Sequence, residues 1–288
     1  MRFGIVFANS GPGTLPEYAA GLARLAEENG FESMWTVEHV VVPAGHGSTY
    51  PYSRSGRMPG GEDVPIPDPM VWLSFVAAHT KTLVLGTGIL ILPQRNPLIL
   101  AKEAATLDVL SNGRFQLGVG VGWLKEEFDA LGVPFEERGH RTDEYIAALR
   151  VLWSEPEPSF DGRFVSFEKA KSYPKPVSPN GVPIVIGGHS PGAARRAGRL
   201  GDGFFPALTT PEKLEPLIAE MNAAANEAGR DPSAIEITCG GAFDVEGVKR
   251  FAGMGVSRIV IPPPAWDLEG LKEGLGRFSE DVIGKSKG

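Results

Sequence analysis

The sequence predicts a (β/α)8 barrel, the TIM-barrel fold, on three observations. Short apolar runs alternate with longer segments of helical periodicity, and this alternation repeats eight times along the 288 residues. Within each short run, nearly every residue is apolar. Strands that are separated by helices pair in parallel, and parallel strands are buried on both faces. Eight such units fit a closed barrel of this length. We therefore predict a single domain over 1–288, with insertions after strands two and four; an open doubly wound sheet is the competing fold.

The first four strand–helix units occupy the N-terminal half of the chain. Their strands are predicted over 2–8, 31–40, 82–92 and 114–122. The helices that follow are predicted over 15–30, 67–80 and 96–113, and after the fourth strand over 123–132 and 141–153. Pro97 suits a first helical turn, and Gly30 and Asn112-Gly113 suit helix ends.

The other four units follow in the C-terminal half. Their strands are predicted over 182–188, 202–208, 234–240 and 256–264, and their helices over 190–201, 210–229, 244–255 and 268–279. Ser190-Pro191 combines a favourable N-cap with a proline at the first helical position.

Two segments interrupt this alternation. Residues 41–67 are rich in Gly, Pro and Tyr and follow the second strand, at the end of a barrel that carries active sites. A loop of this length in a compact domain is usually functional, so we interpret 41–67 as a lid-like insertion. The second insertion, 154–181, contains FDGRFVSF, which predicts a short hairpin that turns at Asp161-Gly162.

Composition indicates a soluble cytoplasmic protein. The net charge of -7 is spread along the chain, whereas nucleic-acid binding needs a clustered basic face. No run of eighteen apolar residues predicts a membrane span, and the N-terminus lacks the pattern of a signal peptide. The single cysteine, Cys239, has no partner for an internal disulfide. We expect neither nucleic acid nor a membrane as a partner.

The most distinctive short motif is LGVGVGW, residues 117–123, with glycines at 118, 120 and 122. A dinucleotide fingerprint needs the spacing G-x-G-x-x-G and an acidic residue at the end of the next strand. Both are missing here, since the next strand, VPIVIGG, has no acid. Either the small residues relieve crowding inside the barrel, or they leave room for a flat ligand.

The loop GGHSPGAARRAG, residues 187–198, is a better candidate for phosphate binding. It joins an apolar strand to a helix, where free amides and the helix dipole attract anions. An ordinary strand-to-helix turn explains the same pattern. Cys239-Gly240-Gly241 is a second candidate, because barrel phosphate sites often use the last two loops.

Glu38-His39 ends the second strand. A histidine beside a carboxylate at a barrel mouth can transfer protons to or from a substrate, and a polar pair satisfied at the start of a loop is the alternative. The remaining histidines show no metal-binding spacing, so we expect no metal, and no G-x-S-x-G motif supports a serine nucleophile.

Four segments together resemble the luciferase-like flavin/deazaflavin oxidoreductase family, in its order and spacing. They are WTVEHV, GTGILILPQRNP, GRFQLGVGVGWLKEEFDALG and PIVIGGHSPGAARRAGRLGDGFFP, and the resemblance covers residues 1–210. Their combination is most similar to an actinobacterial branch that uses coenzyme F420, a deazaflavin; FMN enzymes share the fold and several motifs. The resemblance implies a barrel with the cofactor ring at its carboxyl-terminal mouth.

The resemblance also assigns residues. It implies a non-proline cis peptide at Gly88-Ile89 that backs the ring, with Gly120 and Gly122 leaving space for the ring system. It places the cofactor phosphate against Gly187, Gly188, His189 and Ser190. It makes Glu38 and His39 the catalytic acid–histidine pair.

One position departs from the family pattern. Trp123 stands where F420 dehydrogenases carry a glutamate after the strand-four glycines, which makes His39 the main general acid/base and Trp123 a wall of the substrate pocket. Tyr50, Tyr52 and Arg57 in the first insertion are candidates for closing over the substrate, although each suits a plain surface position.

The leading hypothesis is an F420-dependent oxidoreductase that transfers a hydride between the deazaflavin and a small organic substrate. The alternatives are an FMN-dependent monooxygenase that uses reduced flavin, and a non-catalytic flavin- or deazaflavin-binding protein. The missing acid at Trp123 keeps the last one open. The resemblance implies a homodimer.

Overall fold

The computed structural model describes residues 1–53, 55–207 and 209–286, and its central feature is a closed parallel barrel. The barrel strands, in order around the barrel, are β1 (Arg2–Ile5), β2 (Ser33–Thr36), β3 (Val84–Thr87), β5 (Phe115–Gly120), β8 (Ile184–Gly187), β9 (Gly203–Phe205), β10 (Glu236–Gly240) and β11 (Val256–Ile261). Each strand pairs in parallel with its neighbours, and β1 pairs with β11 to close the ring. The predicted barrel is confirmed, and the open sheet is wrong.

The third strand is divided. β4 (Leu90–Ile91) continues it after an interruption at residues 88–89 and pairs with β5, as β3 does. Leu208, at the end of the predicted strand 202–208, and Arg54, in the first insertion, lie outside the described residues.

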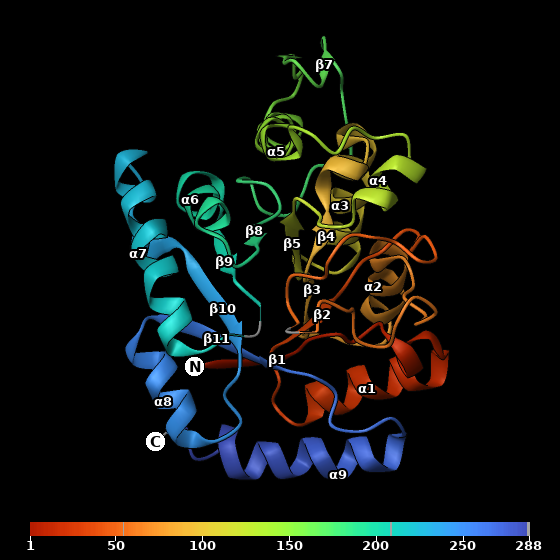
Figure 1. The fold of residues 1–288 in the computed structure, drawn as a ribbon, viewed down its shortest axis with the longest axis vertical. Helices are drawn as coiled ribbons and strands as arrows, with labels where there is room; N and C mark the ends of the chain where they lie inside the picture. Colours follow the sequence, from red (N-terminus) through yellow and green to blue (C-terminus); the bar gives the residue numbers. More distant parts are fainter. Residues whose placement is uncertain (54, 208, 287–288) are drawn as a thin grey trace.

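Helices surround the strands (Figure 1). They are α1 (Pro16–Glu28), α2 (Pro69–Ala77), α3 (Pro97–Leu110), α4 (Lys125–Ala130), α5 (Arg138–Ser154), α6 (Pro191–Leu200), α7 (Pro211–Glu227), α8 (Val245–Gly253) and α9 (Leu268–Phe278). Four shorter helical turns are η1 (Gly11–Thr14), η2 (Leu92–Gln94), η3 (Pro232–Ala234) and η4 (Ser279–Ile283). Each predicted helix is present within a few residues of its expected ends.

Local chemistry explains where several helices begin. The side chains of Asp68, Asn96 and Ser190 accept hydrogen bonds from backbone amides in the first turns of α2, α3 and α6. A proline follows each of these N-caps, at a position where a missing amide hydrogen costs nothing and the fixed φ favours the helix. The N-cap predicted at Ser190 is confirmed.

Two apolar cores result from the alternation of side chains along the strands. The larger core lies between the strands and the helices and includes Phe3, Leu85 and Leu117. The smaller core fills the barrel itself. It consists of Val6, Trp35, Val185, Phe205 and Val260, with Phe7 packed against it. The barrel interior is therefore packed with side chains, as in other barrels of this kind.

The amino-terminal end of the barrel is closed by charged groups. The Arg258 side chain is 1% exposed and donates hydrogen bonds to both carboxylate oxygens of Glu32, at 2.7 and 2.8 Å, and to Thr238. Its guanidinium carbon lies 5.3 Å from the ring centroid of Trp35. A buried arginine needs such partners, because an unpaired buried charge is costly.

The first insertion runs between β2 and α2 without helix or strand among its described residues, and both of its ends are held together. The Asn9 amide nitrogen donates to Val37 O at 2.9 Å and to Pro67 O at 3.1 Å. The Arg95 guanidinium also joins the two ends, because it binds both Glu38 and Asp68. The insertion is a closed loop on a fixed base.

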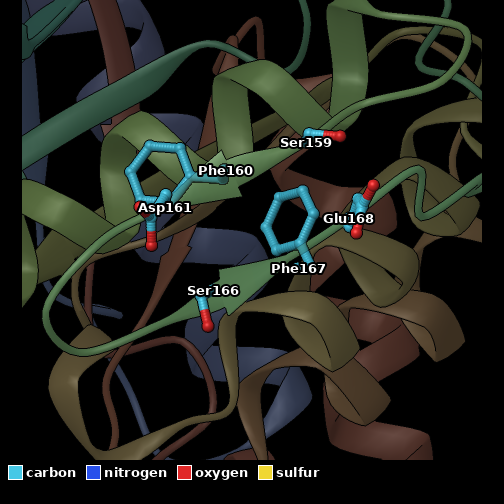
Figure 2. Close-up of a pocket in the computed structure, with 6 residues that line it drawn as sticks. All are labelled: Ser159, Phe160, Asp161, Ser166, Phe167 and Glu168. Atoms are coloured by element: carbon cyan, nitrogen blue, oxygen red, sulfur yellow. The ribbon is translucent and has the colours of Figure 1, made fainter.

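The second insertion contains the predicted hairpin. Strands β6 (Phe160–Asp161) and β7 (Ser166–Phe167) pair antiparallel, and the rings of Phe160 and Phe167 stack with centroids 6.0 Å apart. Figure 2 shows these two rings on neighbouring strands, in a shallow hollow that Ser159, Asp161, Ser166 and Glu168 also line. None of the predicted site residues lines this hollow.

Among the described residues, no helix has both the length and the hydrophobicity that a bilayer crossing requires.

Candidate active site

The predicted site residues come together at one end of the barrel. His39 follows β2, Gly88-Ile89 divides the third strand, Trp123 follows β5, and His189 follows β8. Because the strands are parallel, these positions all lie at the carboxyl-terminal end, where barrel enzymes carry their active sites. We call this end the mouth of the barrel.

His39 is paired with an acid that the sequence analysis did not single out. Its Nδ1 lies 3.0 Å from Oε2 of Glu127 in α4. The Glu127 side chain is fully buried, and that of His39 is 9% exposed. The other carboxylate oxygen, Oε1, accepts hydrogen bonds from the amides of Val40 at 2.6 Å and Val41 at 3.3 Å. Glu127 therefore fixes both the His39 ring and the backbone that follows it.

Glu38 makes a different set of contacts. Its carboxylate accepts hydrogen bonds from the Arg95 guanidinium and from the amide of Ile91. The side chain is 2% exposed, and Arg95 also binds Asp68. Burial raises the pKa of Glu38, and the Arg95 charge opposes that rise. Glu38 thus joins β2 to the third strand, and the acid paired with His39 is Glu127.

Trp123 is the centre of an aromatic cluster at the mouth. Its ring meets the rings of His39 and His46 edge to face, each at a centroid distance of 5.6 Å. Tyr50 packs on it at 5.3 Å and on Tyr52 at 5.4 Å. His39 is therefore held between a carboxylate and an indole, and the first insertion packs against the end of β5.

The first insertion also reaches the loop after β8. The Tyr52 ring lies 4.5 Å from the ring of His189, centroid to centroid. Glu126, next to Glu127 in α4, accepts hydrogen bonds from the amides of Gly47 at 2.8 Å and Ser48 at 3.1 Å. Arg57 is exposed, and its backbone amide donates to Ser55 Oγ. Tyr50 and Tyr52 thus lie over the mouth, whereas Arg57 is at the surface.

The peptide bond between Gly88 and Ile89 is cis, as the family resemblance implies. The Ile89 side chain lies in the barrel beside β5 and β8. A Cβ atom at Gly120 would lie 2.6 Å from Ile89 Cδ1, and one at Gly187 would overlap Ile89 Cγ2. Both glycines are needed because Ile89 occupies the space where their side chains would be.

This packing bears on the interpretation of LGVGVGW. A Cβ at Gly118 would overlap the carbonyl oxygen of Thr87, and one at Gly122 would lie 2.8 Å from Ile91 Cγ2. Gly118, Gly120 and Gly122 therefore face alternate residues of the third strand. These residues are Thr87, Ile89 and Ile91. The packing supports the first interpretation, that the small residues relieve crowding inside the barrel. That Gly120 and Gly122 also leave space for a ring system stays a prediction.

The loop after β8 has the features of an anion site. Gly188 has φ +118°, which residues other than glycine rarely adopt, and Ser190 caps α6 through a hydrogen bond from the amide of Ala193 at 3.2 Å. Burial and the nearby charge of Lys213 lower the pKa of His189. The other candidate loop also turns through a glycine, Gly241 at φ +114°, but Cys239 itself is fully buried.

The arrangement supports proton transfer at the mouth. His39 presents an imidazole held by a buried carboxylate, next to an aromatic cluster and at the same end of the barrel as the loop after β8. Fold and site together define the class of protein: a (β/α)8 barrel with a carboxylate-held histidine at its carboxyl-terminal mouth, where barrel enzymes carry their active sites.

The comparisons give the family. The model of the luciferase-like monooxygenase family matches residues 1–245, and this chain belongs to that family. An uncharacterized protein of Mycobacterium tuberculosis is 34% identical over 273 residues, which cover 92% of this chain and 94% of that protein. An F420-dependent glucose-6-phosphate dehydrogenase of Amycolatopsis mediterranei is 34% identical over 231 residues, 77% of this chain and 62% of the dehydrogenase. The chain is an oxidoreductase of this family.

Solved structures match the fold over its whole length. An F420-dependent secondary alcohol dehydrogenase, in complex with an F420-acetone adduct, has a TM-score of 0.80 and 22% identity, and the match covers 98% of both chains. The monooxygenase RslO1 of Streptomyces bottropensis has a TM-score of 0.79 and 24% identity over 99% of both chains. At these identities the structures support the barrel fold alone.

Proposed function

We propose that this protein is an F420-dependent oxidoreductase that transfers a hydride between the deazaflavin and a small organic substrate. The observation that carries the proposal is His39, which is held at the barrel mouth between Glu127 at 3.0 Å and Trp123, at the same end as the cis bond of Ile89. The relatives named as F420-dependent dehydrogenases support the choice of cofactor.

The residues at the mouth fit a phosphorylated deazaflavin. The loop of Gly187, Gly188, His189 and Ser190 would hold the phosphate, because it combines a helix N-terminus with a backbone turn that only glycine adopts easily. The charge of Lys213 near His189 also favours an anion. Ile89 would support the ring from the barrel side, and Gly120 and Gly122 would act indirectly, by admitting the third strand.

The residues around the site divide into three roles. His39 would hold or move the proton of the substrate, and the bound deazaflavin would supply the hydride chemistry. Glu38, through Arg95 and the amide of Ile91, would position the third strand behind the ring. Trp123, Tyr50 and Tyr52 would form the wall of the substrate pocket; Arg57 would contribute only when the insertion moves.

A second candidate is an FMN-dependent monooxygenase. Trp123 favours it, because the residue stands where F420 dehydrogenases carry a glutamate, and the mouth then depends on one histidine for proton transfer. An oxygen-activating flavin needs a site from which water is kept out, and an aromatic wall is compatible with that need.

Titration of the purified protein with F420 and, separately, with FMN tests the proposal through fluorescence quenching. We expect F420 to bind at least tenfold more tightly, which corresponds to about 1.4 kcal/mol. F420 reduction is then followed by absorbance with 2-propanol and with glucose 6-phosphate as first substrate probes. FMN binding that is tighter by tenfold would contradict the proposal and support the monooxygenase.

A further inference from the structure

We propose that Glu127 is a positioning residue that fixes the tautomer of His39, with the proton on Nδ1 and the lone pair on Nε2. The expected effect on turnover rests on the proposed function. The tautomer of His39 does not, because it depends only on contacts within the protein. Glu127 contacts neither the reacting atoms nor the cofactor loop in this assignment, and acts through the His39 ring.

The first step concerns what surrounds the carboxylate. Glu127 is fully buried, and three donors share its charge: Val40 N and Val41 N on Oε1, and the His39 ring on Oε2. A buried carboxylate is costly unless hydrogen bonds satisfy it. Because the two amides occupy Oε1, Oε2 depends on a proton from His39 Nδ1, at 3.0 Å.

The second step concerns the ring nitrogens. A neutral imidazole has one donor and one acceptor, so a proton on Nδ1 leaves Nε2 as the acceptor. The Trp123 ring stands nearly perpendicular to the imidazole, at 86°, and limits its rotation. In oxidation of an alcohol, Nε2 would take the hydroxyl proton, and a deazaflavin held at the mouth would supply the hydride chemistry. In reduction of a carbonyl, the protonated ring returns that proton.

The third step concerns the connection to the first insertion. Val40 and Val41 begin this insertion, so the carboxylate that orients His39 also fixes the backbone from which the insertion starts. The hydrogen bonds of the neighbouring Glu126 go to the amides of Gly47 and Ser48, further along the insertion. The two neighbouring acids of α4 thus offer one test residue and one comparison residue.

Substitution Glu127→Gln makes a sharp prediction. The two backbone amides still need an acceptor, so the amide oxygen of Gln turns to them and its NH2 group faces the ring. An NH2 group only donates, so Nδ1 must become the acceptor and the ring proton moves to Nε2. With the wrong tautomer, kcat falls by roughly 10²–10⁴-fold, while KM and F420 affinity stay within about twofold.

The test is ¹⁵N NMR of the histidine side chains in the apo-protein. The chain has five histidines, and His39→Gln identifies the signal of His39. We expect the Nδ1–H tautomer in the wild type and in Glu126→Gln, and the Nε2–H tautomer in Glu127→Gln. Asp129→Asn, which changes an exposed acid of the same helix, is the control for folding and turnover.

The outcomes separate this inference from the proposed function. An Nε2–H tautomer in the wild type overturns it, and so does an unchanged tautomer in a folded Glu127→Gln protein. If Glu127→Gln does not fold, the wild-type tautomer and the Glu126→Gln comparison still decide. If the tautomers are as expected but F420 does not bind the wild type, the proposed function fails and the role of Glu127 toward His39 stands.

Discussion

The two ends of the barrel use buried charge in different ways. At the amino-terminal end, Arg258, Glu32 and Thr238 all project from, or directly adjoin, barrel strands, and their donors and acceptors satisfy one another. At the mouth, His39 and Glu127 come from a loop and a short helix, and within residues 1–53, 55–207 and 209–286 only Nδ1 of the histidine has a hydrogen-bond partner. The first arrangement satisfies a buried charge within the barrel. The second holds one histidine nitrogen and leaves Nε2 without a partner among the described residues.

Under the proposed function, the difference separates an end that supports stability from an end that supports chemistry. Charges that are fully paired within the strands contribute to folding and are indifferent to a bound molecule. An imidazole with one fixed and one free nitrogen is suited to proton transfer. We therefore expect substitutions at the two ends to have separate effects, and each prediction below either sharpens that separation or contradicts it.

The largest effect on stability should come from Arg258→Met. It removes the charged hydrogen bonds that Glu32 receives from a buried partner. Because Glu32 is 26% exposed and keeps Arg2 at 3.6 Å, we expect a loss of about 1–3 kcal/mol in the free energy of unfolding. Denaturant unfolding measures the loss, and F420 affinity of the folded protein should not change. The double variant Glu32→Gln/Arg258→Met should recover part of the stability; recovery of none would mean that the pair is not the cause.

His39→Ala should have the largest effect on turnover. The substitution removes the only proton-transfer group that Glu127 positions, and kcat should fall by roughly 10²–10⁴-fold. F420 affinity should stay within about twofold, and thermal unfolding should change little compared with Arg258→Met. Unchanged turnover would remove His39 from its role, and a stability loss as large as that of Arg258→Met would erase the contrast between the two ends.

Gly188→Asp should weaken cofactor binding at the mouth. The backbone at φ +118° strains any side chain, so Gly188→Asn is the matched control with the same shape and no charge. We expect the Asp variant to bind F420 roughly tenfold more weakly than the Asn variant, because its charge faces the phosphate. Equal affinities of the two variants, measured by fluorescence titration, would refute the phosphate assignment.

The smallest effect concerns pH. Burial raises the pKa of the Glu32 carboxyl, but the hydrogen bonds and charge of Arg258 outweigh burial and hold this pKa below its usual value of 4.5. A carboxyl whose pKa is depressed in the folded state contributes stability above its unfolded pKa and loses it as pH falls through the folded pKa. The difference in melting temperature between wild type and Glu32→Gln should therefore be constant above about pH 5.5 and shrink below pH 4.5. A difference that grows on acidification would contradict the ion pair.

The sequence allowed most of the fold to be predicted, because strands and helices have different periods and because the cap at Ser190 and the first-turn proline Pro97 depend on local chemistry. The hairpin is equally local, but its turn was predicted at Asp161-Gly162 and lies over residues 162–165, because Asp161 pairs with Ser166 in the strands. The position of the cis bond came from the family resemblance and is confirmed at Gly88-Ile89.

The site was harder to predict, because its contacts join distant segments. His39 and Glu127 are 88 residues apart, and nothing local indicates that the second acid of LKEE is buried while the first lies near the surface. Glu38 is adjacent to His39 in sequence and was paired with it for that reason; along an extended chain, neighbouring side chains point in different directions. The role of Gly120 depends on Ile89, which no local pattern reveals.

The fixed base of the first insertion has a consequence for how such enzymes diversify. Asn9 and Arg95 lie outside the insertion and join residues 37–38 to residues 67–68. The entropic cost of closing a loop rises only slowly with its length, so the length of the segment between these two points has a small effect on stability. Segments of other lengths and compositions can therefore replace residues 49–66 without disturbing the barrel or the His39–Glu127 pair. Exchange of this segment should change the aromatic wall that Tyr50 and Tyr52 form at the mouth and leave the His39–Glu127 pair in place.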